Sequence, residues 1–186
     1  MTSTYAIDSI KAVTLQSPAG MQVTLLNIGA TIQSINIPTE SGMINAVLGY
    51  ANHDEYLSDN FYMGATVGRF ANWIGNACFS LGDKTFSVGA NDNGNCLHGG
   101  SDGFHRRFWK IRSISDEEAV EFSYMSPDGE GGFPGELDIK VTYRIVDDFS
   151  LAIDFVATTN TETIINIANH AYFNLSSHQH LIDAHH

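Results

Sequence analysis

Apolar and polar side chains alternate with a period of two along much of this chain, and this alternation constrains the fold more than any other feature. A period of two places successive side chains on opposite faces of a strand, so that one face is buried and the other meets water. The pattern occurs at residues 77–81, 120–124 and 151–155. It is longest where apolar residues stand at Ile139, Val141, Tyr143 and Ile145. We therefore expect a β-strand at each of these four places.

Glycine-containing pairs separate neighbouring runs of this kind. Gly82-Asp83 lies between two short runs, a spacing typical of a two-residue hairpin. Gly29-Ala30 separates residues 23–28 from residues 31–37 in the same way. The sequence thus predicts two antiparallel strand pairs.

Helical spacing is nearly absent. Only residues 53–58, which follow an N-cap candidate at Asn52, predict a short helical turn. Many short strands with Gly-rich connections favour an antiparallel β-sandwich or barrel. A length of 186 residues is enough for one domain with a sizeable core, so we expect residues 1–186 to form a single all-β domain.

The charge balance excludes several classes of partner. Lys and Arg total 9 against 21 for Asp and Glu, and the net charge of −12 repels nucleic acids and anionic membranes. The N-terminus lacks the basic head and apolar run of a signal peptide, and no stretch is long and apolar enough to cross a bilayer. We therefore expect a cytoplasmic protein. Cys78 and Cys96 lack metal-ligand spacing, which predicts two reduced thiols, with a single bridge as the alternative.

Two Gly-rich segments, residues 90–103 and 126–135, interrupt the strands. Glycine lets the backbone approach a ligand closely, and loops on a rigid sheet often carry sites. The turn-rich composition of residues 126–135 favours a surface connection. The first segment contains His98, which taken alone would be a structural loop histidine. Flat aromatic rings with a few fixed polar groups suit a sugar, and aromatic residues follow at Phe104, Phe108 and Trp109.

Two further clusters carry polar groups. Residues 68–73 include Arg69, which taken alone would be a surface ion-pair partner. Residues 169–175 place His170 between an amide and aromatic side chains, directly after a predicted strand. Imidazole can donate or accept a proton near neutral pH, so His170 is the main candidate for proton transfer.

Taken in order along the chain, these segments resemble the aldose 1-epimerase family, the galactose mutarotases. Any one segment alone would be a weak motif, but five in the same order make a chance resemblance improbable. The matching segments are residues 64–72, 79–86, 97–100 with Gly103-Phe104, 126–135 and 169–175.

The resemblance implies a large antiparallel β-sandwich with a sugar bound in a groove on one sheet. It also implies that the α and β anomers of an aldose such as galactose or glucose are interconverted. In that reaction a base takes the proton of the anomeric hydroxyl and an acid protonates the ring oxygen. The ring then opens, and closure on the other carbonyl face reverses both transfers. The resemblance implies no metal and no organic cofactor, and a full-length protein would be a monomer or a homodimer.

The resemblance also implies roles for individual residues. His170 matches the family's general acid at the ring oxygen, and His98 matches the second histidine, which holds the sugar. Asn72 matches a residue that contacts substrate, and Tyr172 lies in the substrate-facing part of the last motif. Trp73 departs from the family, which has an arginine here. Its indole cannot replace a guanidinium fork but can stack on a pyranose, so either the substrate preference has shifted or binding is weaker.

A second departure concerns the base. In the family the base is a glutamate, assisted by a substrate-binding aspartate, and both occur well beyond the segment that matches residues 169–175. The acidic residues here match neither position, including Glu130, Glu136 and Asp138. We therefore expect these residues to be the N-terminal part of an epimerase that lacks its C-terminal strands. Sheet edges and an apolar inner face would then be uncovered.

Two other functions stay open. A non-catalytic sugar-binding or regulatory module would keep the groove and both histidines, and Trp73 together with the absent base favours it. An enzyme of the same fold acting on hexose 6-phosphates would need a basic phosphate pocket, which the acidic balance does not favour.

Histidines also crowd the last nine residues, at His178, His180, His185 and His186. Imidazole is a common zinc ligand, but Asp183 is the only nearby carboxylate and no cysteine completes a ligand pattern. We therefore expect no metal site there, and instead a solvated tail or the start of another strand.

Overall fold

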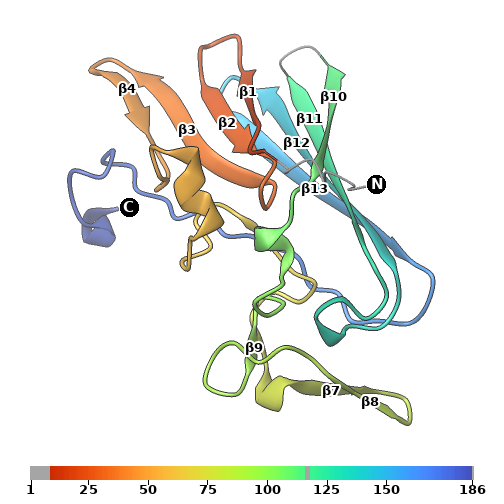
Figure 1. Cartoon of the computed structure of the whole chain (residues 1–186). Helices are drawn as coiled ribbons and strands as arrows, with labels where there is room; N and C mark the ends of the chain where they lie inside the picture. The colour runs from red at the N-terminus through yellow and green to blue at the C-terminus, as the bar shows by residue number, and fades with distance from the viewer. Residues whose placement is uncertain (1–8, 116–117, 186) are drawn as a thin grey trace, which may run out of the picture.

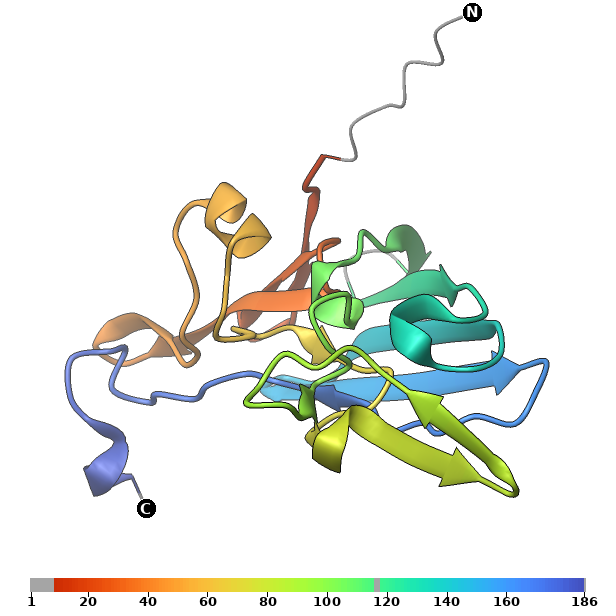
Figure 2. The same cartoon turned by 60° about the horizontal axis from the view of Figure 1, so that its bottom comes forward.

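The computed structural model describes residues 9–115 and 118–185, which contain two four-stranded antiparallel sheets that face each other (Figures 1 and 2). In both sheets each strand pairs with the next strand along the chain. The first sheet consists of β1 (Ala12–Gln16), β2 (Gln22–Leu26), β3 (Thr31–Thr39) and β4 (Gly42–Asn45). The second consists of β10 (Lys110–Ser115), β11 (Ala119–Ser126), β12 (Leu137–Asp147) and β13 (Ser150–Thr159). The predicted all-β, antiparallel sandwich is confirmed.

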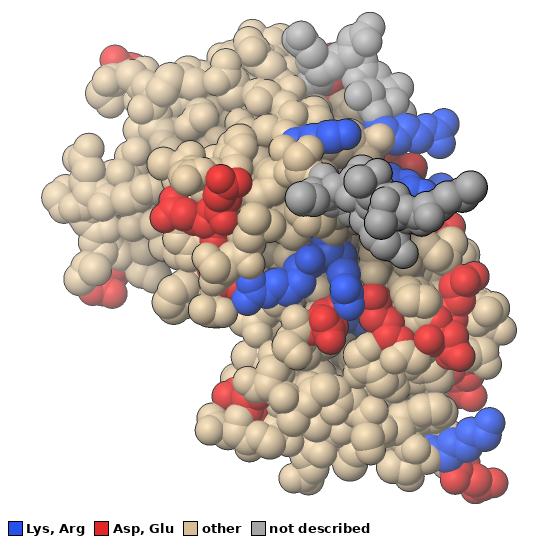
Figure 3. Space-filling model, in the orientation of Figure 1, with Lys and Arg blue, Asp and Glu red and all other residues tan. Residues whose placement is uncertain are grey.

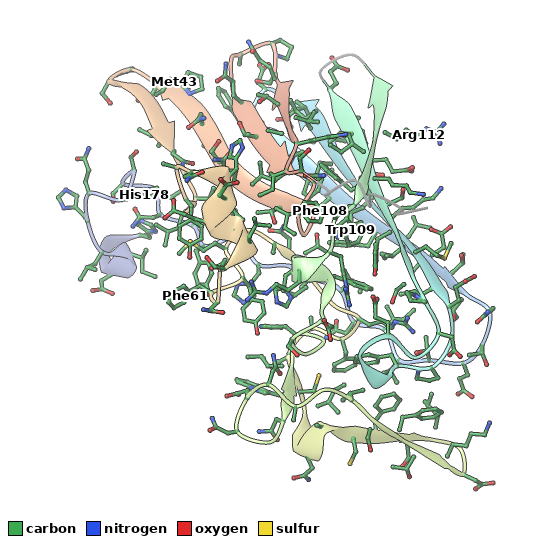
Figure 4. The ribbon with its side chains drawn as sticks, viewed as in Figure 1. Met43, Phe61, Phe108, Trp109, Arg112 and His178 are labelled. Atoms are coloured by element: carbon green, nitrogen blue, oxygen red, sulfur yellow. The ribbon has the colours of Figure 1, made fainter. Side chains whose placement is uncertain are left out.

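The main core lies between the two sheets and follows directly from the period-two pattern. Alternate side chains of β12 are buried, namely Leu137, Ile139, Val141, Tyr143 and Ile145. They pack with apolar residues of the first sheet that include Leu15, Val23, Leu25 and Ile32. Each such side chain contributes about 1.5–3 kcal/mol when it is removed from water. Trp109 lies between the sheets (Figure 4) and is 2% exposed.

A smaller group of strands lies below the two sheets in Figure 1. β7 (Cys78–Leu81) and β8 (Lys84–Ser87) form the predicted hairpin, with Gly82-Asp83 as its loop. β6 (Trp73–Ile74) pairs with β9 (Cys96–Leu97). Ala77, expected in the strand, instead ends the turn η2 (Gly75–Ala77), because its φ of 48° is incompatible with a strand. Both cysteines are free thiols, as predicted.

The helical segments are short 3-10 turns. The predicted one is η1 (His53–Leu57), where the Asn52 side chain accepts a hydrogen bond from the Asp54 N–H and the Glu55 carboxylate accepts one from the Asn52 N–H. The others are η2, described above, and η3 (Phe104–Arg106), η4 (Glu130–Gly132) and η5 (Ile182–Ala184). Within residues 9–115 and 118–185, no helix has the length and apolar character needed to span a membrane.

The C-terminal segment runs back along the first sheet. β14 (Ala168–Asn169) pairs with β5 (Thr66–Val67), and the Leu48 N–H then donates to the Tyr172 carbonyl at 2.8 Å. Residues 176–185 form turns and η5, so within these residues the alternative of another strand is wrong. Figure 4 shows His178 on this last segment, where its Nε2 lies 2.8 Å from the Val47 carbonyl oxygen. Among the residues that the structure describes, no three His, Cys, Asp or Glu side chains are grouped as metal ligands.

The Arg69 side chain is buried and donates hydrogen bonds to another segment of the chain, so the expectation of a surface ion-pair partner is wrong. It is 2% exposed, and its guanidinium points at the Gly-rich segment 126–135 instead of at water. It donates to the carbonyl oxygens of Pro134 (2.9 Å) and Gly135 (2.8 Å) and to the Ser126 hydroxyl (2.6 Å). The Arg69 guanidinium therefore holds the segment 126–135 in place next to the loop that carries His98.

An apolar groove of about 390 Å³ opens between the two sheets. It lies beside β13, which is an edge strand of its sheet and whose inward side chains at Leu151, Ile153 and Phe155 are only partly buried. Phe173 and Leu175 on the other side of the groove are more than half exposed. This arrangement agrees with the expected uncovered inner face.

The surface carries charges of both signs. Figure 3 shows Lys and Arg side chains toward the centre and right of this face, with Asp and Glu side chains close by. Arg107, for example, lies 3.0 Å from Glu130 and 3.6 Å from Asp102.

Candidate active site

Two of the expected site residues, Asn72 and His98, are joined by two hydrogen bonds. The His98 N–H donates to the Asn72 carbonyl at 3.1 Å, and the Asn72 N–H donates to Nδ1 of the His98 ring at 2.9 Å. Asn72 precedes β6 and His98 follows β9, so the β6–β9 pairing brings them together. Asn72 itself is exposed and its side-chain oxygen accepts the Trp73 N–H at 3.0 Å.

This contact fixes the tautomer of His98. A ring nitrogen that accepts a hydrogen bond cannot also carry the proton, so neutral His98 carries it on Nε2. Burial, together with the nearby His170 imidazole, lowers the pKa of His98 to about 4. Near neutral pH, His98 is therefore an uncharged N–H donor. This suits a group that holds a sugar oxygen.

His170 lies beside His98, with ring centroids 5.0 Å apart and planes 80° apart. Two backbone hydrogen bonds fix its position: its N–H donates to the Ala65 carbonyl at 2.9 Å, and its carbonyl accepts the Gly64 N–H at 3.1 Å. Within the described ranges no group bonds to its ring nitrogens, so both can meet a ligand. The structure thus places the two expected histidines on one face, from segments 72 residues apart.

The remaining expected residues surround this pair. The Tyr172 ring lies 5.0 Å from the His170 ring, and its hydroxyl donates to the Phe61 carbonyl at 2.9 Å. Figure 4 shows Phe61 outside the core, and its side chain is 62% exposed. Trp73 is 58% exposed, and its indole N–H donates to the Asp92 carboxylate at 2.7 Å. The indole is therefore held in one orientation at the rim, with its ring open to solvent.

Two residues of this site, Tyr62 and His105, were not predicted from the sequence. The His105 ring lies 4.6 Å from the Tyr62 ring, and its Nδ1 is buried without a hydrogen-bond partner in the described part of the chain. Burial, with a smaller effect of Arg106, lowers the pKa of His105 to about 4. The signal available was proximity in sequence: Tyr62 stands two residues before the first family segment, and His105 directly follows Gly103-Phe104.

The low pKa values have a consequence for stability. A histidine whose pKa falls from its ordinary 6.5 to about 4 on folding favours the folded state only while it is neutral. This contribution of His98 and His105 is present above pH 6.5. It is lost as the pH falls from 6.5 towards 4.

Several residues of the site adopt left-handed backbone conformations. Tyr62, Asn72 and His98 have φ values of 58°, 73° and 53°. Such conformations are uncommon outside glycine and persist where the surrounding structure enforces them. Gly99 follows with a φ of 86°, and its backbone packs directly against Gly68 and Arg69.

Gly99→Ala is therefore expected to lower the free energy of unfolding by at least about 3 kcal/mol. The added Cβ would lie 1.9 Å from the Gly68 carbonyl oxygen, which is backbone and cannot rotate away. Gly82→Ala is the matched control, since Gly82 also has a positive φ of 54° but no atom within 4 Å of the new Cβ. It should cost only about 1 kcal/mol. Urea unfolding of both variants measures the difference, and equal losses would show that the contact at Gly99 relaxes freely.

Comparison with known proteins shows the family of this chain. The family profile described as aldose 1-epimerase matches residues 11–186. Aldose 1-epimerase of Escherichia coli (strain K12) is 38% identical over 170 residues, which are 91% of this chain and 49% of that protein. Galactose mutarotase of Sus scrofa is 40% identical over 157 residues, which are 84% of this chain and 45% of that protein.

Solved structures show the same fold. The GalM/aldose epimerase homologue from C. elegans superposes with a TM-score of 0.85 at 33% identity and covers 89% of this chain and 51% of that one. Galactose 1-epimerase from Lactobacillus acidophilus NCFM gives a TM-score of 0.80 at 30% identity, with 92% and 52% covered. The chain thus spans about half the length of these relatives. Since the profile match includes both sheets and the histidine pair, the chain belongs to the aldose 1-epimerase family.

Proposed function

We propose that this chain binds a neutral aldose over the His98–His170 pair and provides the acid half of an anomer interconversion. The observation that carries the proposal is the geometry of the two imidazoles, whose centroids are 5.0 Å apart. His98 offers a fixed Nε2–H donor, whereas the ring nitrogens of His170 have no partner among the residues described. In this proposal His98 holds the sugar, and His170 gives a proton to the ring oxygen as the ring opens and takes it back on closure.

The base of the reaction is assigned to no residue of the described ranges. Two carboxylates that act electrostatically on residues of the site, Asp59 on His105 and Asp92 on Tyr62, are already engaged. Asp59 accepts hydrogen bonds from the Tyr50 hydroxyl (2.8 Å) and from the backbone N–H groups of Phe61 (2.9 Å) and Met63 (2.8 Å). Asp92 holds the Trp73 indole. We therefore propose that the base comes from the part of the family's length that this chain does not span.

The charges at the rim support one substrate class. Trp73 occupies the position where the family resemblance implies an arginine, so no guanidinium is present there, and the Asp92 carboxylate lies 2.7 Å from the Trp73 Nε1. The net charge of −12 adds to the unfavourable potential for phosphates. We propose a neutral hexose such as galactose or glucose, with the exposed indole face stacked on the pyranose. A panel that includes galactose 6-phosphate tests this, because tighter binding of the phosphate would contradict it.

Polarimetry tests the activity itself. The chain is added to freshly dissolved α-galactose, and the approach to the α/β equilibrium is compared with that in buffer alone. The proposal expects faster equilibration. A sugar-binding module is the second candidate, favoured by the absence of a base within the described residues. It would show saturable galactose binding without faster equilibration.

Trp73 supplies a direct readout of binding. Trp109 is 2% exposed and Trp73 is 58% exposed, so a sugar that stacks on the rim changes the emission of Trp73. We expect a saturable fluorescence change when galactose is titrated into the chain, and loss of that change in Trp73→Phe. Trp109→Phe is the control and should keep the signal. A signal that survives in Trp73→Phe would place the sugar elsewhere.

A further inference from the structure

Tyr62 is the common neighbour of all three buried or half-buried histidines of the site. Its ring centroid lies 4.8 Å from that of His98, 4.6 Å from that of His105 and 5.6 Å from that of His170. The first two contacts are edge-on, an arrangement that aromatic rings favour. The three histidines come from different parts of the chain, after β9, within η3 and after β14. One phenol ring therefore contacts three imidazoles that no common strand or helix connects.

Tyr62 is itself held on both sides. Its backbone has a φ of 58° and its carbonyl accepts the Ala65 N–H at 3.1 Å. Its hydroxyl lies 3.4 Å from the side-chain nitrogen of Asn91. Asn91 in turn accepts the Leu97 N–H at 2.7 Å and donates to the Leu97 carbonyl at 3.0 Å. Leu97 directly precedes His98. Asn91 therefore links the Tyr62 hydroxyl to the backbone next to His98, and the Tyr62 ring contacts the His98 ring directly.

We propose that Tyr62 is a positioning residue, whose ring holds His98 and His170 at the separation needed to act on one sugar ring and keeps water away from His98. The proposal rests on the function proposed above for the two histidines. Tyr62 is not assigned a contact with the sugar. It acts through the imidazoles that pack against it.

The protonation of the histidines makes this role measurable. Burial is the largest cause of the low pKa of both His98 and His105, and the Tyr62 ring covers part of each. The charged and titratable groups that act on His98 include His170, and those that act on His105 are Arg106, Asp59, His98 and Arg107. Tyr62 adds no charge to this set near neutral pH, since burial raises the pKa of its hydroxyl. Removal of the ring therefore changes hydration and packing without removing a neighbouring charge.

The experiment follows the imidazole nitrogens of the 15N-labelled 186-residue chain by NMR over a pH titration. Four proteins are compared: the unchanged chain, Tyr62→Phe, Tyr62→Ala and Tyr172→Ala. The unchanged chain and Tyr62→Phe should show His98 as the Nε2–H tautomer with a low midpoint. Tyr62→Ala should raise the His98 midpoint by at least about one pH unit, because water reaches the ring. Tyr172→Ala should leave His98 unchanged, since the Tyr172 ring packs against His170 rather than His98.

The outcomes test the positioning role of Tyr62 separately from the function proposed for His98 and His170. A folded Tyr62→Ala chain with the His98 midpoint and tautomer of the unchanged chain would overturn it. If Tyr62→Ala does not fold, Tyr62→Leu fills much of the same volume without a planar ring, and an unchanged His98 there would overturn the proposal equally. The readout needs no turnover. A chain that proves inactive in polarimetry can therefore still show, or fail to show, that Tyr62 positions the imidazoles.

Discussion

His170→Asn is expected to lower the proposed acceleration of α/β-galactose interconversion by about 10²- to 10⁴-fold, the usual contribution of a positioned acid or base. Asparagine keeps hydrogen-bonding groups of similar reach but cannot exchange a proton near neutral pH. The backbone contacts of residue 170, to Gly64 and Ala65, do not involve the side chain and should persist. Fold and sugar binding should therefore survive while turnover falls. Polarimetry measures the rate, and the Trp73 fluorescence titration measures the binding.

His180→Asn is the control for this prediction. His180 is exposed, and its contacts in the described structure are made by its backbone. It should leave the rate unchanged. Equal activity of His170→Asn and the unchanged chain would show that the proton reaches the ring oxygen from another group. If the unchanged chain has no activity, the result would support the second candidate function, a sugar-binding module.

Arg69→Ala should lower the free energy of unfolding by about 3–5 kcal/mol, the scale of breaking a buried charged network. The substitution leaves the carbonyl oxygens of Pro134 and Gly135 and the Ser126 hydroxyl without their donor. It also opens a cavity beneath the Gly-rich segment, because the whole side chain is 2% exposed. Urea unfolding followed by circular dichroism measures the loss.

Arg144→Ala provides the matched comparison. Arg144 also donates to an oxygen at 2.9 Å, on the Asp154 carboxylate, but both side chains are about half exposed. Such surface pairs contribute about 0–1 kcal/mol. Similar losses in the two variants would mean that the guanidinium of Arg69 is far better hydrated than its burial indicates.

The strands were predictable because their signal is local. The alternation from Ile139 to Ile145 indicates which side chains face the core, and it does so without information about the residues opposite them. Every predicted apolar position of β12 is buried. The Gly82-Asp83 hairpin and the Asn52 cap are local in the same sense. Each depends on residues within a few positions of one another.

Burial of polar residues was not predictable in this way. The hydrogen-bond acceptors of Arg69 lie 57 to 66 residues away in the sequence. The residues near Arg69 in the sequence therefore do not show whether its guanidinium is buried or exposed to water. The contacts of Tyr62 with three histidines likewise arise only when β5, β9 and β14 are assembled. The family resemblance supplied His98 and His170, but it carried no information about the groups that hold them in place.

The left-handed backbones at Tyr62, Asn72 and His98 restrict how this protein can be engineered. Loops of enzymes are ordinarily the places where residues can be inserted, deleted or exchanged at little cost. Here the turns that carry the polar groups are tied to one another through main-chain atoms, and only glycine, asparagine and a few others enter such conformations easily. A library that seeks altered ligand binding at this site should therefore keep loop lengths fixed and vary side chains at the rim.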